Sequence, residues 1–220
     1  MSSQIVKVLE TDFLTHNVKR FIVEKPAGFT FISGQATDVS INKPGLEEEL
    51  RPFTFTSINS SEYLEFSIKI YYGHNGITEK LANIHAGDEL IIHDVFGTIT
   101  YHGPGLFIAA GAGITPFISI LRQLKHDKLL YGNHLLFANR TVDDIILRDE
   151  LHEMLGGNYS DVIEDQGAGF GRHIIDLSML KQYVGNFSQY YICGPDKFTF
   201  SMMANLENLG VDKSHIIYEK

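Results

Sequence analysis

The chain has 220 residues, 44% of them hydrophobic and 20% charged, and its formal net charge is −9. This length allows one large domain or two small ones, each able to bury a core. The composition is unlike that of a disordered chain. The acidic charge and the lack of a Lys/Arg run argue against a nucleic-acid partner, because phosphate binding needs a concentrated basic surface.

Four features bear on location and metal chemistry. The longest nearly apolar stretch, Gly105–Ile114, is too short for a membrane span. The N-terminal segment contains Glu10 and Asp12 and lacks the basic flank of a signal peptide, so we expect a cytoplasmic protein. One cysteine, Cys193, cannot form an intramolecular disulfide or hold an iron–sulfur cluster. The histidines are scattered without zinc-site spacing, so no metal site is expected.

The first half of the chain indicates an antiparallel Greek-key β-barrel. Segments rich in β-branched and aromatic residues are separated by clusters of Gly, Pro, Asn and Ser. Leu64, Phe66 and Ile68 alternate with polar residues, which is the period of a half-buried strand. A short helix is expected at Ile77–Ile84. The predicted strands are Val18–Val23, Thr37–Ile41, Phe53–Ile58, Leu64–Ile70 and Leu90–His93.

From Gly105 onward strands alternate with helices, which is typical of a parallel, doubly wound sheet. Thr115 and Pro116 are interpreted as the N-cap hydroxyl and first-turn proline of a helix. Helices are also predicted at Val142–Leu155, Leu177–Val184 and Asp196–Leu209. The five predicted strands are Leu106–Ala110, His134–Ala138, Asp161–Glu164, Gln189–Cys193 and His215–Tyr218. The period changes at a Pro/Gly turn, which divides the chain into domains of residues 1–102 and 103–220.

A glycine motif, Gly111-Ala112-Gly113-Ile114-Thr115-Pro116, follows the first strand of the α/β half. Glycines at this position let the backbone approach a pyrophosphate, and the helix N-terminus presents free N–H groups. An ordinary strand-to-helix turn is the alternative interpretation. A second cluster, Gly167–Gly171, precedes no immediate helix and is interpreted as a loop.

Two further motifs lie in the barrel half. The segment Arg51-Pro52-Phe53-Thr54-Phe55-Thr56-Ser57, read as a strand, places Arg51 and Phe53 on one face and Thr54 and Thr56 on the other. The segment Gly76–Leu81 is a glycine turn leading into a short helix whose N-terminus is a candidate phosphate site. Each motif alone is more often structural, as a buried arginine or a capped helix.

Taken together, these motifs, Cys193-Gly194-Pro195 and the terminal Tyr218-Glu219 resemble the ferredoxin–NADP reductase superfamily, which includes flavodoxin reductases and cytochrome b5 reductases. The resemblance covers nearly the whole chain. It implies an FAD-binding barrel and an NAD(P)-binding α/β domain. The implied activity passes electrons from a nicotinamide cofactor through FAD to a separate carrier such as ferredoxin or flavodoxin. No acid–base dyad is needed, because the cofactors carry the chemistry.

The same resemblance implies roles for individual residues. Arg51 neutralises the flavin pyrophosphate, Phe53 stacks on the isoalloxazine where relatives usually have tyrosine, and Thr54 hydrogen-bonds the flavin. Cys193 faces the nicotinamide crevice, although a small buried hydrophobe is the alternative. Thr54 and Cys193 are therefore the predicted catalytic positions. The other predicted cofactor-binding residues are Pro52, Ile68, Lys69, Gly76, Ile77, Thr78, Gly111, Gly113, Thr115, Pro116, Asn139, Arg140, Gly194, Pro195 and Tyr218.

Several alternatives stay open at this point. Arg140 follows the second α/β strand, where arginine can accommodate a 2′-phosphate, which slightly favours NADPH over NADH. The nearby Asp143 and Asp144 keep NADH open. The acceptor is alternatively a small molecule or free flavin, and the chain is alternatively an electron-transfer subunit of a larger complex or a regulatory module that binds no FAD. The net charge of −9 would repel an acidic carrier unless basic residues gather near the flavin. The sequence does not predict an oligomeric state.

Overall fold

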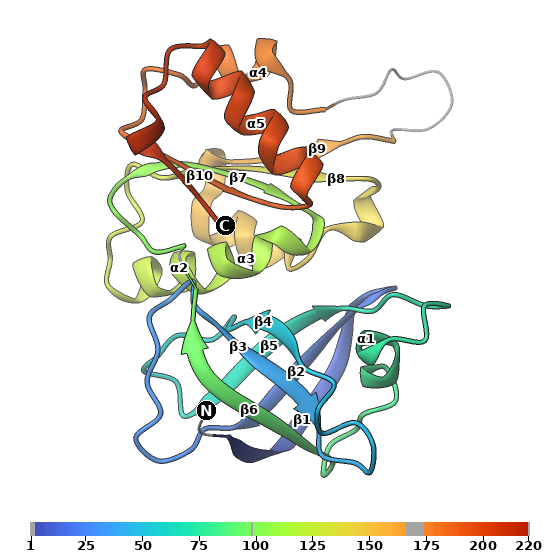
Figure 1. The fold of residues 1–220 in the computed structure, drawn as a ribbon. Coiled ribbons are helices and arrows are strands. Elements are labelled where there is room, and N and C mark those ends of the chain that lie inside the picture. Colours follow the sequence, from blue (N-terminus) through green and yellow to red (C-terminus); the bar gives the residue numbers. More distant parts are fainter. Residues whose placement is uncertain (1–2, 98, 166–173, 220) are drawn as a thin grey trace.

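A computed structural model describes residues 3–97, 99–165 and 174–219, which form a β-barrel followed by an α/β unit (Figure 1). The strands are β1 (Gln4–Thr15), β2 (Val18–Glu24), β3 (Ala36–Ile41), β4 (Arg51–Thr54), β5 (Tyr63–Lys69), β6 (Glu89–Phe96), β7 (Gly105–Ala110), β8 (His134–Asn139), β9 (Tyr159–Ile163), β10 (Gln189–Cys193) and β11 (Ile216–Tyr218). The α-helices are α1 (Ile77–Leu81), α2 (Thr115–His126), α3 (Arg148–Leu155), α4 (Leu177–Lys181) and α5 (Asp196–Asn208). None of the helices in these ranges has the length and apolar character needed to cross a bilayer.

The barrel is a six-stranded antiparallel sheet with the order β4-β3-β6-β1-β2-β5. Its two edges meet just beyond β4, where Phe55 forms an isolated antiparallel bridge with Phe66 of β5. The backbone N–H of Thr56 donates to the Glu65 carbonyl at 2.8 Å in the same place. The rings of Phe31, Phe55 and Phe66 pack inside, with Phe31 stacked on Phe55. This arrangement confirms the predicted antiparallel barrel.

The second unit is a five-stranded parallel sheet with the order β11-β10-β7-β8-β9, as predicted. Neighbouring residues of β7 pack into different cores, Phe107 on one face and Ile108 on the other. Helices α2 and α3 cover the face nearer the barrel, and α4 and α5 cover the opposite face (Figure 1). The chain reverses direction across the sheet at β7, so the carboxyl ends of β7 and β10 lie beside the switch point where such sheets bind ligands.

Several predicted helices differ from the observed ones. The predicted helix Val142–Leu155 is broken, because a Thr141–Asp144 capping box closes the short 3-10 turn Val142–Asp144 and Leu147 adopts a left-handed φ of 52°. Helix α3 therefore begins only at Arg148. Thr115 is not an N-cap, because the 3-10 turn Gly111–Ile114 runs directly into α2 and the Thr115 hydroxyl donates to the Ala112 carbonyl at 3.1 Å. Helices α1 and α4 end earlier than predicted, at Leu81 and Lys181.

The strands also differ in detail. Strand β1 was not among the predicted segments, although its Val6 and Val8 are buried in the barrel core. Strand β4 ends at Thr54 instead of continuing to Ile58, because the chain crosses to β5 at that point. Strand β6 ends at Phe96 and β7 begins at Gly105. The division at residues 102 and 103 stays a prediction, and the predicted loop Gly167–Gly171 lies outside the described residues.

Candidate active site

A cavity of about 420 Å³ lies between the barrel and the α/β unit. The barrel contributes residues of β4 and β5, and the α/β unit contributes the glycine turn before α2 and the chain just after β10. Its lining consists of Ala36, Pro52, Phe53, Thr54, Ser67, Ile68, Lys69, Tyr71, Thr78, Ala112, Gly113, Thr115, Pro116, Cys193, Gly194, Pro195 and Glu219. The motifs identified along the chain therefore contribute residues to one cavity.

The structure brings together most of the predicted site residues. Phe53 and Thr54 both line the cavity, although strand alternation predicted opposite faces, because β4 ends at Thr54 beside the opening. The cavity is also lined by five residues that were not predicted from the sequence: Ala36, Ser67, Tyr71, Ala112 and Glu219. Two of them carried a signal, since Ser67 lies on the same face of β5 as Lys69 and Ala112 stands between two motif glycines.

Other predicted residues lie outside this cavity. Arg51 is exposed at the start of β4, where its guanidinium donates to the Leu50 carbonyl at 2.7 Å. Gly76 and Ile77, at the start of α1, do not line the cavity either, although their neighbour Thr78 does. The remaining predicted positions line adjacent cavities: Gly111, Asn139 and Arg140 border one of about 380 Å³, and Tyr218 borders one of about 500 Å³.

The barrel wall fits a flavin. The hydroxyl of Ser67 is buried and has no hydrogen-bond partner among the described residues, although a buried polar atom normally has one. Ser67 lines the cavity together with Phe53 and Lys69. A ring system with polar edges, such as an isoalloxazine, would satisfy this hydroxyl and pack against Phe53.

The opposite wall requires glycine at position 113. A Cβ atom there would stand 2.4 Å from the carbonyl oxygen of Cys193 and 2.6 Å from the Cα of Gly194. Only a residue without a side chain lets the turn before α2 pack directly against the end of β10. The glycine motif and the Cys193-Gly194-Pro195 segment are therefore parts of one wall.

Cys193 lines this wall as a neutral thiol. Cys193 is 8% exposed. Burial raises the pKa of its thiol to about 12, and the charge of Glu219 contributes to this increase. At neutral pH the group is protonated, so it is neither a nucleophile nor a metal ligand. This state is compatible with the predicted positioning role, which needs only a small side chain of fixed shape.

Because the pKa of the Cys193 thiol is raised, the stability of the folded protein should depend on pH in the alkaline range. The thiol of the unfolded chain loses its proton near its ordinary pKa of 9.0, whereas the folded thiol keeps it up to about 12. The folded state therefore loses about 1.4 kcal/mol per pH unit across this window. We expect the free energy of unfolding to fall more steeply from about pH 9 upward in the wild type than in Cys193→Ala. Denaturant unfolding at several pH values tests this, and parallel curves for the two proteins would contradict it.

The adjacent cavity beyond β8 contains another buried polar group without a partner. Asn139 ends β8 and is 6% exposed, and neither its amide nitrogen nor its amide oxygen finds a partner within the described ranges. It borders the cavity with Arg140, Lys197 and Phe198. This cavity is therefore lined by an amide residue, two cationic side chains, the acidic side chain of Glu164 and an aromatic ring.

Comparison with known proteins identifies the family to which the chain belongs. Residues 107–203 match the family model described as an oxidoreductase NAD-binding domain. NADH–cytochrome b5 reductase 1 of Arabidopsis thaliana is 30% identical over 93% of this chain and 79% of its own length. The chain belongs to the ferredoxin–NADP reductase superfamily. It is an NAD(P)H-dependent flavoprotein oxidoreductase whose cofactors are FAD and NAD(P)H.

Other similar proteins differ in how much of their own length this chain spans. The propane 2-monooxygenase reductase component of Rhodococcus jostii is 28% identical over 89% of this chain, which spans only 57% of that protein. The flavohem-like FAD/NAD-binding domain of a Vibrio cholerae nitric oxide dioxygenase has a TM-score of 0.85 and 23% identity, with coverage of 98% and 97% of the two chains. A Neisseria gonorrhoeae ferredoxin NADP+ reductase, solved with FAD and NADP, has a TM-score of 0.85 and 18% identity, covering 100% and 98%. These likenesses support the same two-part fold.

Proposed function

We propose that residues 1–102 hold FAD, that residues 103–220 hold the nicotinamide coenzyme, and that hydride passes between the two rings inside the cavity of about 420 Å³. One observation carries this proposal. Phe53 and Thr54 of the barrel motif line the same cavity as Cys193 of the α/β unit. Hydride transfer requires the reacting atoms to approach closely in a fixed orientation, and a shared cavity would allow the two rings to meet in this way.

On the barrel side, Phe53 would pack against the isoalloxazine and the hydroxyl of Thr54 would hydrogen-bond its edge. Pro52, Ile68 and Lys69 complete this wall together with Thr78. FAD supplies the hydride-accepting ring. Arg51, Gly76 and Ile77, which lie outside the cavity lining, would contact the flavin pyrophosphate where it leaves the cavity.

On the α/β side, the backbone of Gly111 and Gly113 would bind the coenzyme pyrophosphate. These glycines directly precede α2, which begins with Thr115 and Pro116, and a helix N-terminus presents free N–H groups to an anion. Cys193, Gly194 and Pro195 would hold the nicotinamide in place. Asn139 and Arg140 would bind the adenosine end in the adjacent cavity, and Tyr218 would border the coenzyme near the C-terminus. Arg140 favours a 2′-phosphate, and this makes NADPH the coenzyme that we propose first.

The proposed role of Arg51 gives a direct expectation. Arg51→Ala should weaken FAD binding by about 10- to 100-fold, because it removes a charge-assisted phosphate contact of about 1.5–3 kcal/mol. Arg51 is exposed, so the free energy of unfolding should hardly change. Fluorescence titration of the apoprotein with FAD measures the effect, with Lys181→Ala on exposed α4 as the control cation. An FAD affinity equal to that of the control would remove Arg51 from the flavin site.

We further propose that the electrons leave to a separate protein acceptor. The relatives' names support this, since one names cytochrome b5 and another the reductase component of a monooxygenase. Ferredoxin or flavodoxin stays the specific prediction from the sequence, although the net charge of −9 disfavours an acidic carrier.

The function is tested with the protein reconstituted with FAD. Anaerobic addition of NADPH and, separately, NADH should bleach the flavin absorbance, with the lower half-saturation concentration identifying the coenzyme. A protein that binds FAD but is bleached by neither coenzyme would exclude the proposed reaction. Turnover with cytochrome b5, ferredoxin, flavodoxin and free FMN over a range of salt concentrations then separates the acceptors, because protein docking depends on ionic strength and reduction of free FMN depends on it much less.

A further inference from the structure

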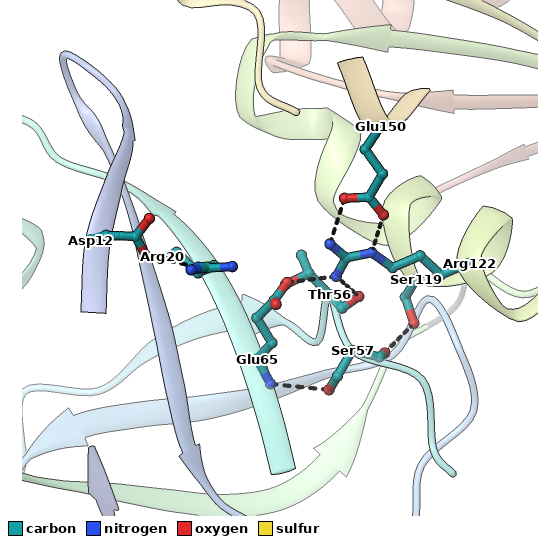
Figure 2. Close-up of polar contacts among 8 residues, drawn as sticks. All are labelled: Asp12, Arg20, Thr56, Ser57, Glu65, Ser119, Arg122 and Glu150. Carbon is teal, nitrogen blue, oxygen red and sulfur yellow. Dashed lines mark hydrogen bonds and ion pairs between the residues drawn. The ribbon is translucent and has the colours of Figure 1, made fainter. Parts of the chain in front are cut away.

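Arg122 of α2 donates four hydrogen bonds, two of which join the α/β unit to the barrel (Figure 2). Its Nη1 donates to the Thr56 carbonyl at 2.8 Å and to Glu65 Oε1 at 2.6 Å, both in the barrel. Its Nε and Nη2 donate to the two carboxylate oxygens of Glu150 in α3, at 2.6 and 2.8 Å. One guanidinium is thus held by a carboxylate from each unit. We call Glu65, Arg122 and Glu150 the interdomain triad.

The barrel end of the triad is buried. The Glu65 side chain is 3% exposed, and the Arg122 side chain is 21% exposed. The Glu65 carboxylate also accepts the Thr56 hydroxyl at 2.7 Å. Burial alone would lower the pKa of Arg122, but its hydrogen bonds and ion pairs with Glu150 and Glu65 raise it overall, so the guanidinium stays charged. Such a buried pair holds the two side chains in a fixed geometry, because separating them would leave a buried charge without a partner.

A second contact joins the same two segments. The Ser119 hydroxyl of α2 donates to the Ser57 carbonyl at 2.7 Å, and the Ser57 hydroxyl accepts the Glu65 backbone N–H at 3.0 Å (Figure 2). The nearby ion pair of Arg20 with Asp12, at 2.8 Å, differs because both residues belong to the barrel. Helix α2 and the segment around residues 56–65 are therefore joined by several hydrogen bonds between the two units.

Each partner of the link is covalently close to a wall of the cavity. Glu65 shares one face of β5 with Ser67 and Lys69, and both of these line the cavity. Thr56 comes two residues after Thr54, at the point where the barrel closes. Arg122 lies on the helix that begins at Thr115, next to the glycine motif. The contact of Arg122 with Glu65 thus joins two elements, α2 and β5, that each contribute residues to the cavity lining.

We propose that Arg122 is a positioning residue for hydride transfer: the interdomain triad sets the separation of the two cavity walls, and hence of the rings bound to them. The inference rests on the proposed function. A guanidinium suits this task better than an ammonium, because its planar set of donors meets both carboxylates at once in one fixed orientation. A lysine has a single nitrogen and cannot keep Glu65, Thr56 and both oxygens of Glu150 together.

The test compares two double variants. Glu65→Gln with Arg122→Met removes the ion pair between the units without leaving an unpaired charge at the buried position 65, and Glu150, whose side chain is 29% exposed, can be solvated, so the fold should survive. Lys125→Met with Glu153→Gln removes an ion pair of 2.7 Å between the same two helices, α2 and α3, but one that does not reach the barrel. The single variant Arg122→Lys keeps the charge and loses the planar fork.

The readout is anaerobic stopped-flow reduction of the flavin-bound fraction by saturating NADPH or NADH, with the coenzyme dissociation constant and the primary deuterium isotope effect measured in the same series. We expect the limiting rate of the E65Q/R122M protein to fall about 10- to 100-fold with little change in the dissociation constant, because a displacement of about 1 Å can cost that much. The limiting rate of Arg122→Lys should also lie below that of the wild type, and the rate of the K125M/E153Q control should equal that of the wild type.

The outcomes separate this proposal from the proposed function. A wild type whose bound flavin is not bleached by either coenzyme removes the proposed function itself. A wild type that is bleached, with E65Q/R122M reduced at the control rate, overturns the positioning role of Arg122 alone. Loss of FAD from E65Q/R122M with an unchanged reduction rate in the remaining bound fraction also overturns it, because the triad would then serve only stability.

Discussion

Gly113→Ala is expected to destabilise the protein by about 1–3 kcal/mol and to lower flavin reduction to a small fraction of the wild-type rate. The added Cβ would stand 2.4 Å from the carbonyl oxygen and 2.5 Å from the carbonyl carbon of Cys193. These contacts are with backbone atoms, which cannot rotate away as a side chain does. The turn before α2 must therefore separate from the end of β10, and the wall that would bind the coenzyme is displaced.

The matched control for this substitution is Gly157→Ala. Gly157 lies in the 3-10 turn after α3, and a Cβ there would meet nothing within 4 Å. Thermal unfolding and anaerobic flavin reduction are measured for both variants beside the wild type. If Gly113→Ala is as stable and as fast as Gly157→Ala, the packing of the glycine turn against β10 has no part in coenzyme binding.

Cys193→Ala is expected to lower the limiting rate of flavin reduction by about tenfold or more while leaving FAD bound. The residue lines the cavity at the end of β10, on the α/β wall. Removing the sulfur leaves space into which the nicotinamide can tilt, and the orientation needed for hydride transfer is lost. Because the thiol stays protonated up to a pKa of about 12, the rate of the wild type should show no step from its ionisation near neutral pH.

Cys193→Ser serves as the comparison, since it restores an atom of similar size without the reactivity of a thiol. We expect its rate to lie nearer that of the wild type than that of the alanine variant. FAD content is determined from the visible spectrum before each single-turnover experiment. Alanine and wild-type proteins with equal rates at saturating coenzyme would exclude Cys193 from positioning the nicotinamide.

Local patterns sufficed for the fold because each half has its own period. Alternation at Leu64–Ile70 and the repeat of strand and helix after Gly105 both correspond to observed strands. The alternation failed in one respect, since Glu65 and Ser67 on the polar face of β5 are 2% and 6% exposed. A sequence period shows which face is apolar, but it does not show that α2 will cover the polar face as well.

The site followed a similar rule. Phe53, Gly113 and Cys193 were predicted from the sequence because they stand in contiguous motifs. All three line the cavity of about 420 Å³. Arg122 differs, because the sequence alone indicates only a cation near a helix C-terminus, where it complements the macrodipole. Its partner Glu65 is 57 positions away in the chain, and no local pattern indicates which cation will meet a buried carboxylate in another domain.

The central claim is that a flavin and a nicotinamide ring meet in the cavity bordered by Thr54 and Cys193. A crystal structure of the protein with FAD and an oxidised nicotinamide cofactor tests it most directly. We expect the isoalloxazine against Phe53, the nicotinamide beside Cys193, and the two rings in contact between them. A flavin bound elsewhere on the barrel, or a nicotinamide held apart from the flavin by the intervening protein, would contradict the claim.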